Sequence, residues 1–124
     1  MNRCRRLTAA LSVATGLLCY HLPGAARADL NQLDTAAFQA GVCADRTDKL
    51  LESHCFQFLR SALGGMSVAA SMANFQLPFC VLDSVSYDRI RTSFVAYMSA
   101  RPKFGKESAV AMLNEALKQD YPCS

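Results

Sequence analysis

The sequence of 124 residues lacks most of the patterns on which enzymes depend. It has two histidines, and only His54 lies beyond residue 28, so a histidine-based catalytic triad has no support. Neither a glycine-rich phosphate loop nor an H-E-x-x-H metal motif occurs. Charged residues make up only 19% and apolar residues 52%, which excludes a disordered chain. We therefore expect one small globular domain that is not an enzyme and has no catalytic, cofactor-binding or metal-binding residue.

Positive charge is concentrated at the N-terminus. Residues 1–28 contain four arginines and no acidic residue, whereas residues 29–124 carry nine basic and ten acidic residues. Because this second part is almost neutral, electrostatics do not favour a nucleic-acid partner.

Residues 1–28 have the three parts of a signal peptide. A basic start is followed by a mostly apolar run, residues 7–22, and then by the small-x-small pattern Ala26-Arg27-Ala28. These features predict cleavage after Ala28, export to the periplasm, and a mature single domain of residues 29–124 without membrane attachment.

Two alternatives to a cleaved signal peptide are disfavoured. A retained membrane anchor would need about 20 apolar residues to cross the bilayer core, and the run is shorter and interrupted by polar residues. A lipoprotein would need a small residue before Cys19, where Leu18 stands.

The mature part keeps four cysteines: Cys43, Cys55, Cys80 and Cys123. An even number of cysteines in an oxidising compartment indicates two disulfides. Zinc is the alternative, but no paired C-x₂₋₄-C spacing occurs. A cysteine nucleophile would have to use His54, which is adjacent to Cys55 and would point to a different face of a helix.

Apolar residues recur at helical spacing in four segments, and no segment alternates long enough to predict a strand. The expected fold is an all-α, small up-and-down bundle of about four helices, stapled by two disulfides. The four apolar stripes are Leu30, Leu33, Ala37 and Ala40; Leu51, Cys55, Phe58, Leu59, Ala62, Leu63 and Met66; Tyr87, Ile90, Phe94, Tyr97 and Met98; and Ala109, Met112, Leu113, Ala116 and Leu117.

Capping and breaking residues set the expected limits of these helices. The first lies near residues 30–43, with Gly41 weakening its end. Thr47 or Asp48 caps the second, and Gly64-Gly65 should fray or kink it, which leaves open whether it resumes through residues 68–73. Residues 74–83 form a connector. Ser86 caps the third helix, Arg101-Pro102 ends it, and the fourth runs from after Gly105 to Tyr121-Pro122.

Short motifs along residues 50–123 resemble the resistance-associated and type VI amidase immunity protein family. The motifs are Cys55-x-x-Phe58-Leu59; Phe79-Cys80; Tyr97-Met98 followed by Arg101-Pro102; and Ala109…Ala116-Leu117…Tyr121-Pro122-Cys123. The chain departs from the family pattern at three positions: Ser61 stands for a glycine, Leu82 for a proline and Arg101 for a histidine.

The resemblance implies a small exported helical protein that inhibits a secreted cell-wall amidase delivered by type VI secretion, acting as a homodimer. The alternative is a periplasmic helper or small-ligand binding protein of the same fold without a toxin partner. We expect partner contacts in the segment 64–77, which has the least regular pattern, at Met66, Met72, Asn74, Phe75 and Gln76. Met66 and Phe75 could instead simply cover one end of the bundle.

The bundle topology predicts the disulfide pairing among three possible connectivities. Cys80 and Cys123 each follow the end of a helix, and these two helices run the same way, so both cysteines should lie at one pole. Cys43 and Cys55 flank the first helix–helix turn at the opposite pole. We therefore expect the pairs Cys43–Cys55 and Cys80–Cys123.

Overall fold

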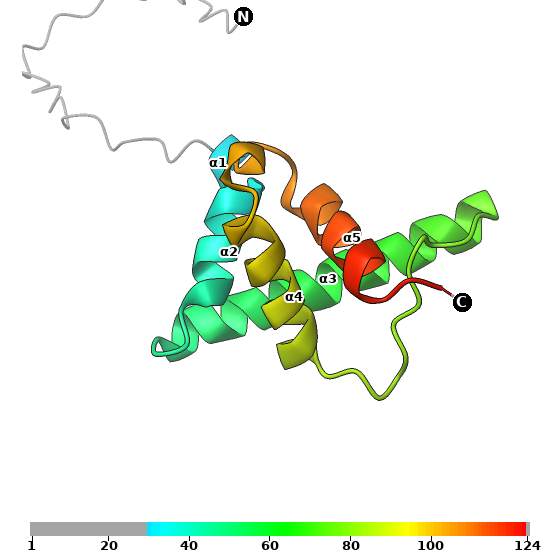
Figure 1. Ribbon diagram of the computed structural model, residues 1–124, viewed down its shortest axis with the longest axis horizontal. Helices are drawn as coiled ribbons and strands as arrows, with labels where there is room; N and C mark the ends of the chain where they lie inside the picture. The colour runs from blue at the N-terminus through cyan, green and yellow to red at the C-terminus, as the bar shows by residue number, and fades with distance from the viewer. Residues whose placement is uncertain (1–29, 124) are drawn as a thin grey trace, which may run out of the picture.

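The computed structural model describes residues 30–123, which form an all-helical domain (Figure 1). The segment expected to be a signal peptide lies outside the described residues. No strand occurs within residues 30–123, where the only β-type pairing is an isolated bridge between Thr35 and Ser108. The elements in chain order are α1 (Leu30–Leu33), α2 (Ala36–Ala44), α3 (Lys49–Ala73), α4 (Tyr87–Ser99), the 3₁₀ turn η1 (Pro102–Phe104) and α5 (Ala109–Asp120).

The longest helix, α3, runs across the molecule, and the shorter helices pack against one another and against its N-terminal half (Figure 1). α4 lies in the middle and contacts α2, α3 and α5. Leu59, Phe94, Leu113 and Leu117 are fully buried where these helices meet. The C-terminal part of α3 extends beyond the bundle, so it has few neighbours. The predicted bundle of about four helices is thus confirmed, with one helix much longer than the others.

Side-chain caps fix where the helices begin. The Asp48 carboxylate accepts hydrogen bonds from the backbone N–H groups of Leu50 and Leu51, and the Ser86 hydroxyl accepts one from Arg89. Both residues were expected caps, and each satisfies donors that the first helical turn leaves without partners. Ser108 caps α5 in the same way, which places the start of that helix after Ser108.

Two expectations about the helices are wrong. α3 continues through Gly64-Gly65 to Ala73 without a break, so the segment 64–77 is helical over most of its length. Each glycine costs a helix only about 1 kcal/mol relative to alanine, which buried Ala70 and the left-handed cap at Asn74 offset. Tyr87 and Leu33 belong to the apolar stripes that were expected to face the core, but each is 39% exposed.

The first helix also differs from the expectation. It is divided at Asp34-Thr35, and α2 then passes Gly41 and ends at Ala44. Thr35 accounts for the division, because its side chain caps the new helix by accepting a hydrogen bond from the Phe38 N–H.

The start of α2 is held by the segment before α5. Ala36 and Ala37 donate backbone hydrogen bonds to the carbonyl oxygens of Glu107 (2.8 Å) and Gly105 (2.9 Å). Ala109 donates in return to the Asp34 carbonyl oxygen at 2.8 Å. A Cβ at Gly105 would lie 3.0 Å from the Ala37 Cβ, so a larger residue would have to push the two segments slightly apart.

Both disulfides connect the predicted partners. Cys43 and Cys55 are joined across the α2–α3 turn, and Cys80 and Cys123 join the α3–α4 connector to the C-terminal tail, each with a Cα–Cα distance of 4.9 Å. None of the helices within residues 30–123 is both long and apolar enough to cross a membrane.

Candidate functional site

The surface of α3 that continues beyond the bundle is uncharged and partly apolar. No charged residue occurs between Arg60 and Asp83, a stretch that includes the second half of α3 and most of the connector. Val68, Met72 and Phe75 are 58%, 84% and 50% exposed. Exposed apolar side chains grouped in this way are typical of surfaces that bind another molecule.

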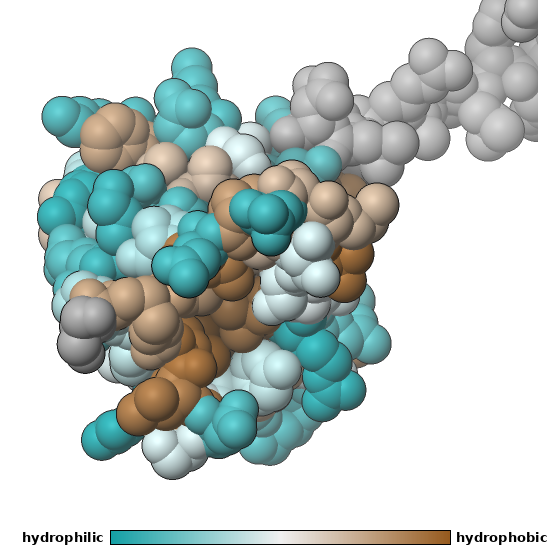
Figure 2. All heavy atoms as spheres, turned by 90° about the vertical axis from the view of Figure 1, so that its right-hand side faces the viewer, coloured by the Kyte–Doolittle hydropathy of each residue, from teal (hydrophilic) through white to brown (hydrophobic). Residues whose placement is uncertain are grey.

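A hollow of about 600 Å³ lies between the C-terminal half of α3, the connector and α5. We call it the distal hollow. Figure 2 views the molecule from the end where α3 projects and shows hydrophobic side chains gathered around a depression on this face. The lining residues are Met66, Ala69, Phe75, Leu77, Pro78, Ser108, Val110, Ala111, Met112, Asn114 and Glu115.

The five residues expected to contact a partner divide into two groups. Met66 and Phe75 both line the distal hollow. Met72, Asn74 and Gln76 are exposed at the end of α3 and the beginning of the connector but do not line it. All five therefore belong to one end of the molecule, although the helix that carries Met66 and Met72 is regular rather than irregular.

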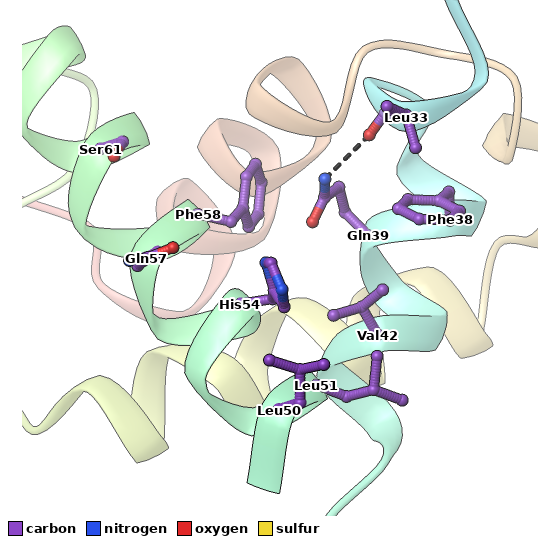
Figure 3. Close-up of a pocket in the computed structure, with 10 residues that line it drawn as sticks. All are labelled: Leu33, Phe38, Gln39, Val42, Leu50, Leu51, His54, Gln57, Phe58 and Ser61. Carbon is purple, nitrogen blue, oxygen red and sulfur yellow. Dashed lines mark hydrogen bonds between the residues drawn. The ribbon is translucent and has the colours of Figure 1, made fainter. Parts of the chain in front are cut away.

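A second hollow, of about 480 Å³, lies between α2 and the N-terminal half of α3 (Figure 3). We call it the proximal hollow. Its walls are mostly apolar, with polar groups from Gln39, His54 and Gln57. The Gln39 side chain donates a 2.8 Å hydrogen bond to the Leu33 carbonyl oxygen, which fixes it at the rim. The remaining lining residues are Leu33, Phe38, Val42, Leu50, Leu51, Phe58 and Ser61.

The proximal hollow was not predicted from the sequence. One feature of the sequence could have indicated it: the spacing of four residues places them on one helical face. They are Leu50, His54, Gln57 and Ser61.

A third, smaller hollow connects the first two along α3. It shares Phe58 and Ser61 with the proximal hollow and Ser108 and Val110 with the distal one. The three hollows together form a discontinuous groove beside α3. Asp34 and Glu115 are the only Asp, Glu, Lys or Arg residues in their lining, and Lys118 pairs with Glu115 at 3.4 Å.

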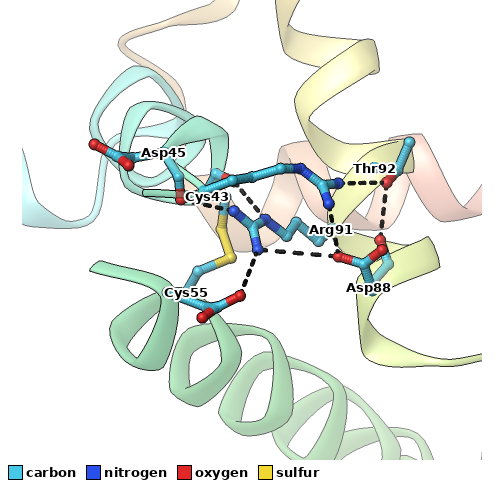
Figure 4. Close-up of a disulfide and its surroundings, with 8 residues drawn as sticks. Cys43, Asp45, Cys55, Asp88, Arg91 and Thr92 are labelled. Atoms are coloured by element: carbon cyan, nitrogen blue, oxygen red, sulfur yellow. Dashed lines mark hydrogen bonds and ion pairs between the residues drawn. A yellow bond between two sulfur atoms is a disulfide. The ribbon is translucent and has the colours of Figure 1, made fainter. Parts of the chain in front are cut away.

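A buried arginine lies beside the Cys43–Cys55 disulfide (Figure 4). Arg91, which is 1% exposed, donates from Nε to the Cys43 carbonyl oxygen at 2.6 Å and from Nη2 to that of Asp45 at 2.7 Å. Its Nη1 lies 3.6 Å from a Glu52 carboxylate oxygen and 3.9 Å from one of Asp88. Arg91 therefore connects the C-terminal end of α2 to α3 and α4. Its positive charge also interacts favourably with the negative end of the α2 dipole.

Carboxylates near Arg91 are stabilised in their charged form. The pKa of Asp45 is lowered because its carboxylate accepts hydrogen bonds from the backbone N–H groups of Asp48 and Thr47. The pKa of Glu52 is lowered mainly by the hydrogen bond and charge of Lys49. Both groups are held as anions at neutral pH, which suits a structural role and not proton transfer.

Arg101, one of the departures from the family pattern, also has a structural role. Its guanidinium lies 4.1 Å from the centre of the Tyr97 ring and donates a 2.9 Å hydrogen bond to the Gln119 side chain. These contacts tie the end of α4 to α5.

The described part of the chain offers surfaces for binding and no evident catalytic cluster. Within residues 30–123 no group of three or more histidine, cysteine, aspartate or glutamate side chains is arranged to hold a metal ion. All four cysteines of this region are paired in disulfides, so none presents a free thiolate.

Comparison with known proteins identifies the family. A family model described as Rap1a immunity proteins matches residues 24–123. No curated protein and no solved structure matches the chain. The family match includes the five α-helices and two disulfides described within residues 30–123, together with the distal hollow. The chain therefore belongs to the Rap1a immunity protein family.

Proposed function

We propose that this protein is an exported immunity protein that binds and inhibits a secreted peptidoglycan amidase in the periplasm. Membership in a family of immunity proteins is the observation that carries this proposal. Two disulfides in a small domain fit an oxidising compartment, and the basic and apolar N-terminal segment fits a signal peptide. The activity is binding, and a homodimer is part of the same proposal, supported by the family resemblance.

The distal hollow and the projecting end of α3 are the proposed contact surface. Met72 and Phe75 are large apolar side chains that the folded domain leaves exposed. Burying such anchors in a partner's cleft contributes a large share of the affinity in protein interfaces. Asn74 and Gln76 lie beside them and provide hydrogen-bonding groups at the edge of the proposed contact surface.

Co-expression with a cognate amidase tests the function. We expect protection from lysis by the full chain and none by a version without residues 1–28, because the partner acts outside the cytoplasm. Lysis in both cases, together with no copurified amidase, would contradict the proposal. Light scattering of the purified protein tests the homodimer separately.

Two matched variants test the contact surface. Met72→Asp should weaken amidase binding by at least about 2 kcal/mol while leaving helical content unchanged, because it places a charge in an apolar interface. Leu50→Asp, at the opposite end of α3 and 66% exposed, is the control and should bind normally. The reverse result would move the contact surface to the proximal hollow.

The proximal hollow supports a second candidate function, the binding of a small apolar ligand without a toxin partner. Its volume of about 480 Å³ and its apolar walls with a few polar groups are typical of ligand pockets. Binding of the fluorescent probe anilinonaphthalene sulfonate should then be lost in Leu50→Asp and kept in Val68→Asp, which is similarly exposed but lies outside this hollow. Equal binding by the two variants would count against this candidate.

A further inference from the structure

The two disulfides lie in opposite environments. Cys43 and Cys55 are 1% and 0% exposed, behind the buried Arg91 and the α2–α3 packing. Cys80 and Cys123 are both exposed to solvent. Thiol–disulfide exchange requires that a thiolate reach a sulfur atom of the bridge. The exposed bridge is therefore open to attack, whereas the buried bridge is shielded from it.

The exposed bridge holds a segment that has few other attachments. The connector between α3 and α4 spans residues 74–86. Within its residues 76–85, the one backbone hydrogen bond to another part of the described chain runs from the Cys80 N–H to the Tyr121 carbonyl oxygen, at 2.8 Å. Phe79, at 6% exposure, is the only buried side chain of this segment, and Leu77, Val81 and Val85 are partly buried against the core. The bridge is therefore the strongest attachment of the connector to the C-terminal tail.

We propose that Cys80–Cys123 is a thiol–disulfide exchange site, which a dithiol oxidoreductase or a small dithiol opens and closes on the folded protein. One thiolate of the reductant attacks a sulfur of the bridge, forms a mixed disulfide and releases the other cysteine as a thiolate that takes up a proton. The second thiol of the reductant then displaces the remaining cysteine. Two electrons pass to the bridge, and the reductant becomes a disulfide.

Opening this bridge changes the distal hollow. Phe75, Leu77 and Pro78 of the connector form one wall of that hollow, while α3 and α5 form the rest. Phe79 is the one connector residue in the core cluster, and Leu77, Val81 and Val85 pack against its edge; the other members come from α2, α3, α4 and α5, so we expect the helix–helix core to persist when the bridge is opened. An effect of redox state on amidase binding rests on the proposed function, whereas the exchange itself does not.

Stepwise reduction of the purified oxidised protein with dithiothreitol tests the site. Thiols are trapped with iodoacetamide during the reaction and located by peptide mass mapping. Cys80 and Cys123 should be modified at least about tenfold faster than Cys43 and Cys55, which are the internal control. Release of all four thiols at one rate, or of Cys43 and Cys55 first, would overturn the proposal.

Two further measurements complete the test. Both use the form of the protein in which only the exposed bridge is reduced. Its helical circular dichroism should be retained, and amide hydrogen exchange should rise in residues 76–85 and remain unchanged in α2. A loss of helical signal, or unchanged exchange in the connector, would overturn the claim of a local opening. Amidase binding by the oxidised form alone would link the switch to the partner surface, while no binding by either form would contradict only the proposed function.

Discussion

Among the residues whose structural role was not predicted from the sequence, Arg91 has the largest. A charged residue in an amphipathic helix is normally assigned to the exposed face. The spacing contained a contrary signal, because Arg91 lies three residues before Phe94 and seven before Met98, both of which are buried. What the spacing could not show is that the carbonyl groups at the end of α2, nearly fifty residues earlier, provide its partners.

Replacing Arg91 by methionine should destabilise the domain strongly. Methionine fills a similar space but leaves the Cys43 and Asp45 carbonyl oxygens without a donor, which costs about 2–4 kcal/mol. Urea unfolding measures the loss. The control is Arg89→Met in the same helix, where the side chain is exposed and the change should stay within about 0.5 kcal/mol. Similar effects of the two substitutions would show that the buried contacts contribute little.

The lowered pKa values of Asp45 and Glu52 predict acid sensitivity. A carboxyl group with a lower pKa in the folded state binds protons more tightly when unfolded. Its stabilisation is therefore complete above the unfolded-state pKa of about 4 and is lost as the pH falls through the folded-state value. The urea midpoint should be constant from about pH 7 to 5 and decline below about pH 4.

Asp45→Asn tests the origin of this acid sensitivity. The variant should be less stable than the parent at neutral pH, and its midpoint should depend less on pH, because the titrating group is gone. Asp83→Asn, in the exposed connector, is the control. A pH profile of Asp45→Asn that parallels the parent would assign the effect to other groups.

At the scale of elements, the helices were predicted from apolar periodicity and from the caps at Asp48 and Ser86, all of which depend on neighbouring residues alone. The length of α3 was not predictable in this way. Whether a Gly-Gly pair breaks a helix depends on the contacts of the residues that follow, and here Ala70 is buried and Asn74 adopts a left-handed conformation with φ of 51°. Such contacts arise only in the folded chain.

Substitutions of glycine by alanine should have opposite effects in different elements. Gly64 and Gly65 lie within α3 with no neighbouring atom within 4 Å of an added Cβ, so each substitution should stabilise the domain by about 0.5–1 kcal/mol. Gly105→Ala should destabilise it by about 1–3 kcal/mol, because the added Cβ would lie 3.0 Å from Ala37. Thermal unfolding measures all three. Stabilisation by Gly105→Ala would show that the segment can move away at little cost.

At the scale of the whole molecule, topology explains why the disulfide pairing was predictable and the site was not. The expected helix order placed Cys80 and Cys123 together; in the structure they meet because the connector returns from the end of α3 to the C-terminal tail, where the Cys80 N–H donates to the Tyr121 carbonyl oxygen at 2.8 Å. The distal hollow depends on how far α3 projects past α5 and on the path of the connector. Neither property has a local signal in the sequence.

The distribution of charge predicts how partner binding responds to salt. Residues 61–82 of the proposed surface carry no charge, and Glu115 of the distal hollow is paired with Lys118, so apolar contacts should dominate its affinity. We expect the dissociation constant for the amidase to change by less than about threefold between about 50 and 500 mM NaCl, measured by titration calorimetry. A much larger loss at high salt would indicate charged contacts, and Glu115→Gln would then test the carboxylate that lines the distal hollow.

The attachment of α2 to residues 105–109 bears on the order in which the chain can fold. The first two N–H groups of α2, those of Ala36 and Ala37, find their backbone acceptors in a segment from the last fifth of the sequence. Contacts between such distant segments form late, because closing a long loop must precede any gain from the contact. Synthesis of the N-terminal half therefore cannot complete the domain. Until residues 105–109 have been synthesised, the Ala36 and Ala37 N–H groups lack their acceptors, so the start of α2 is expected to be the last part of the domain to become ordered.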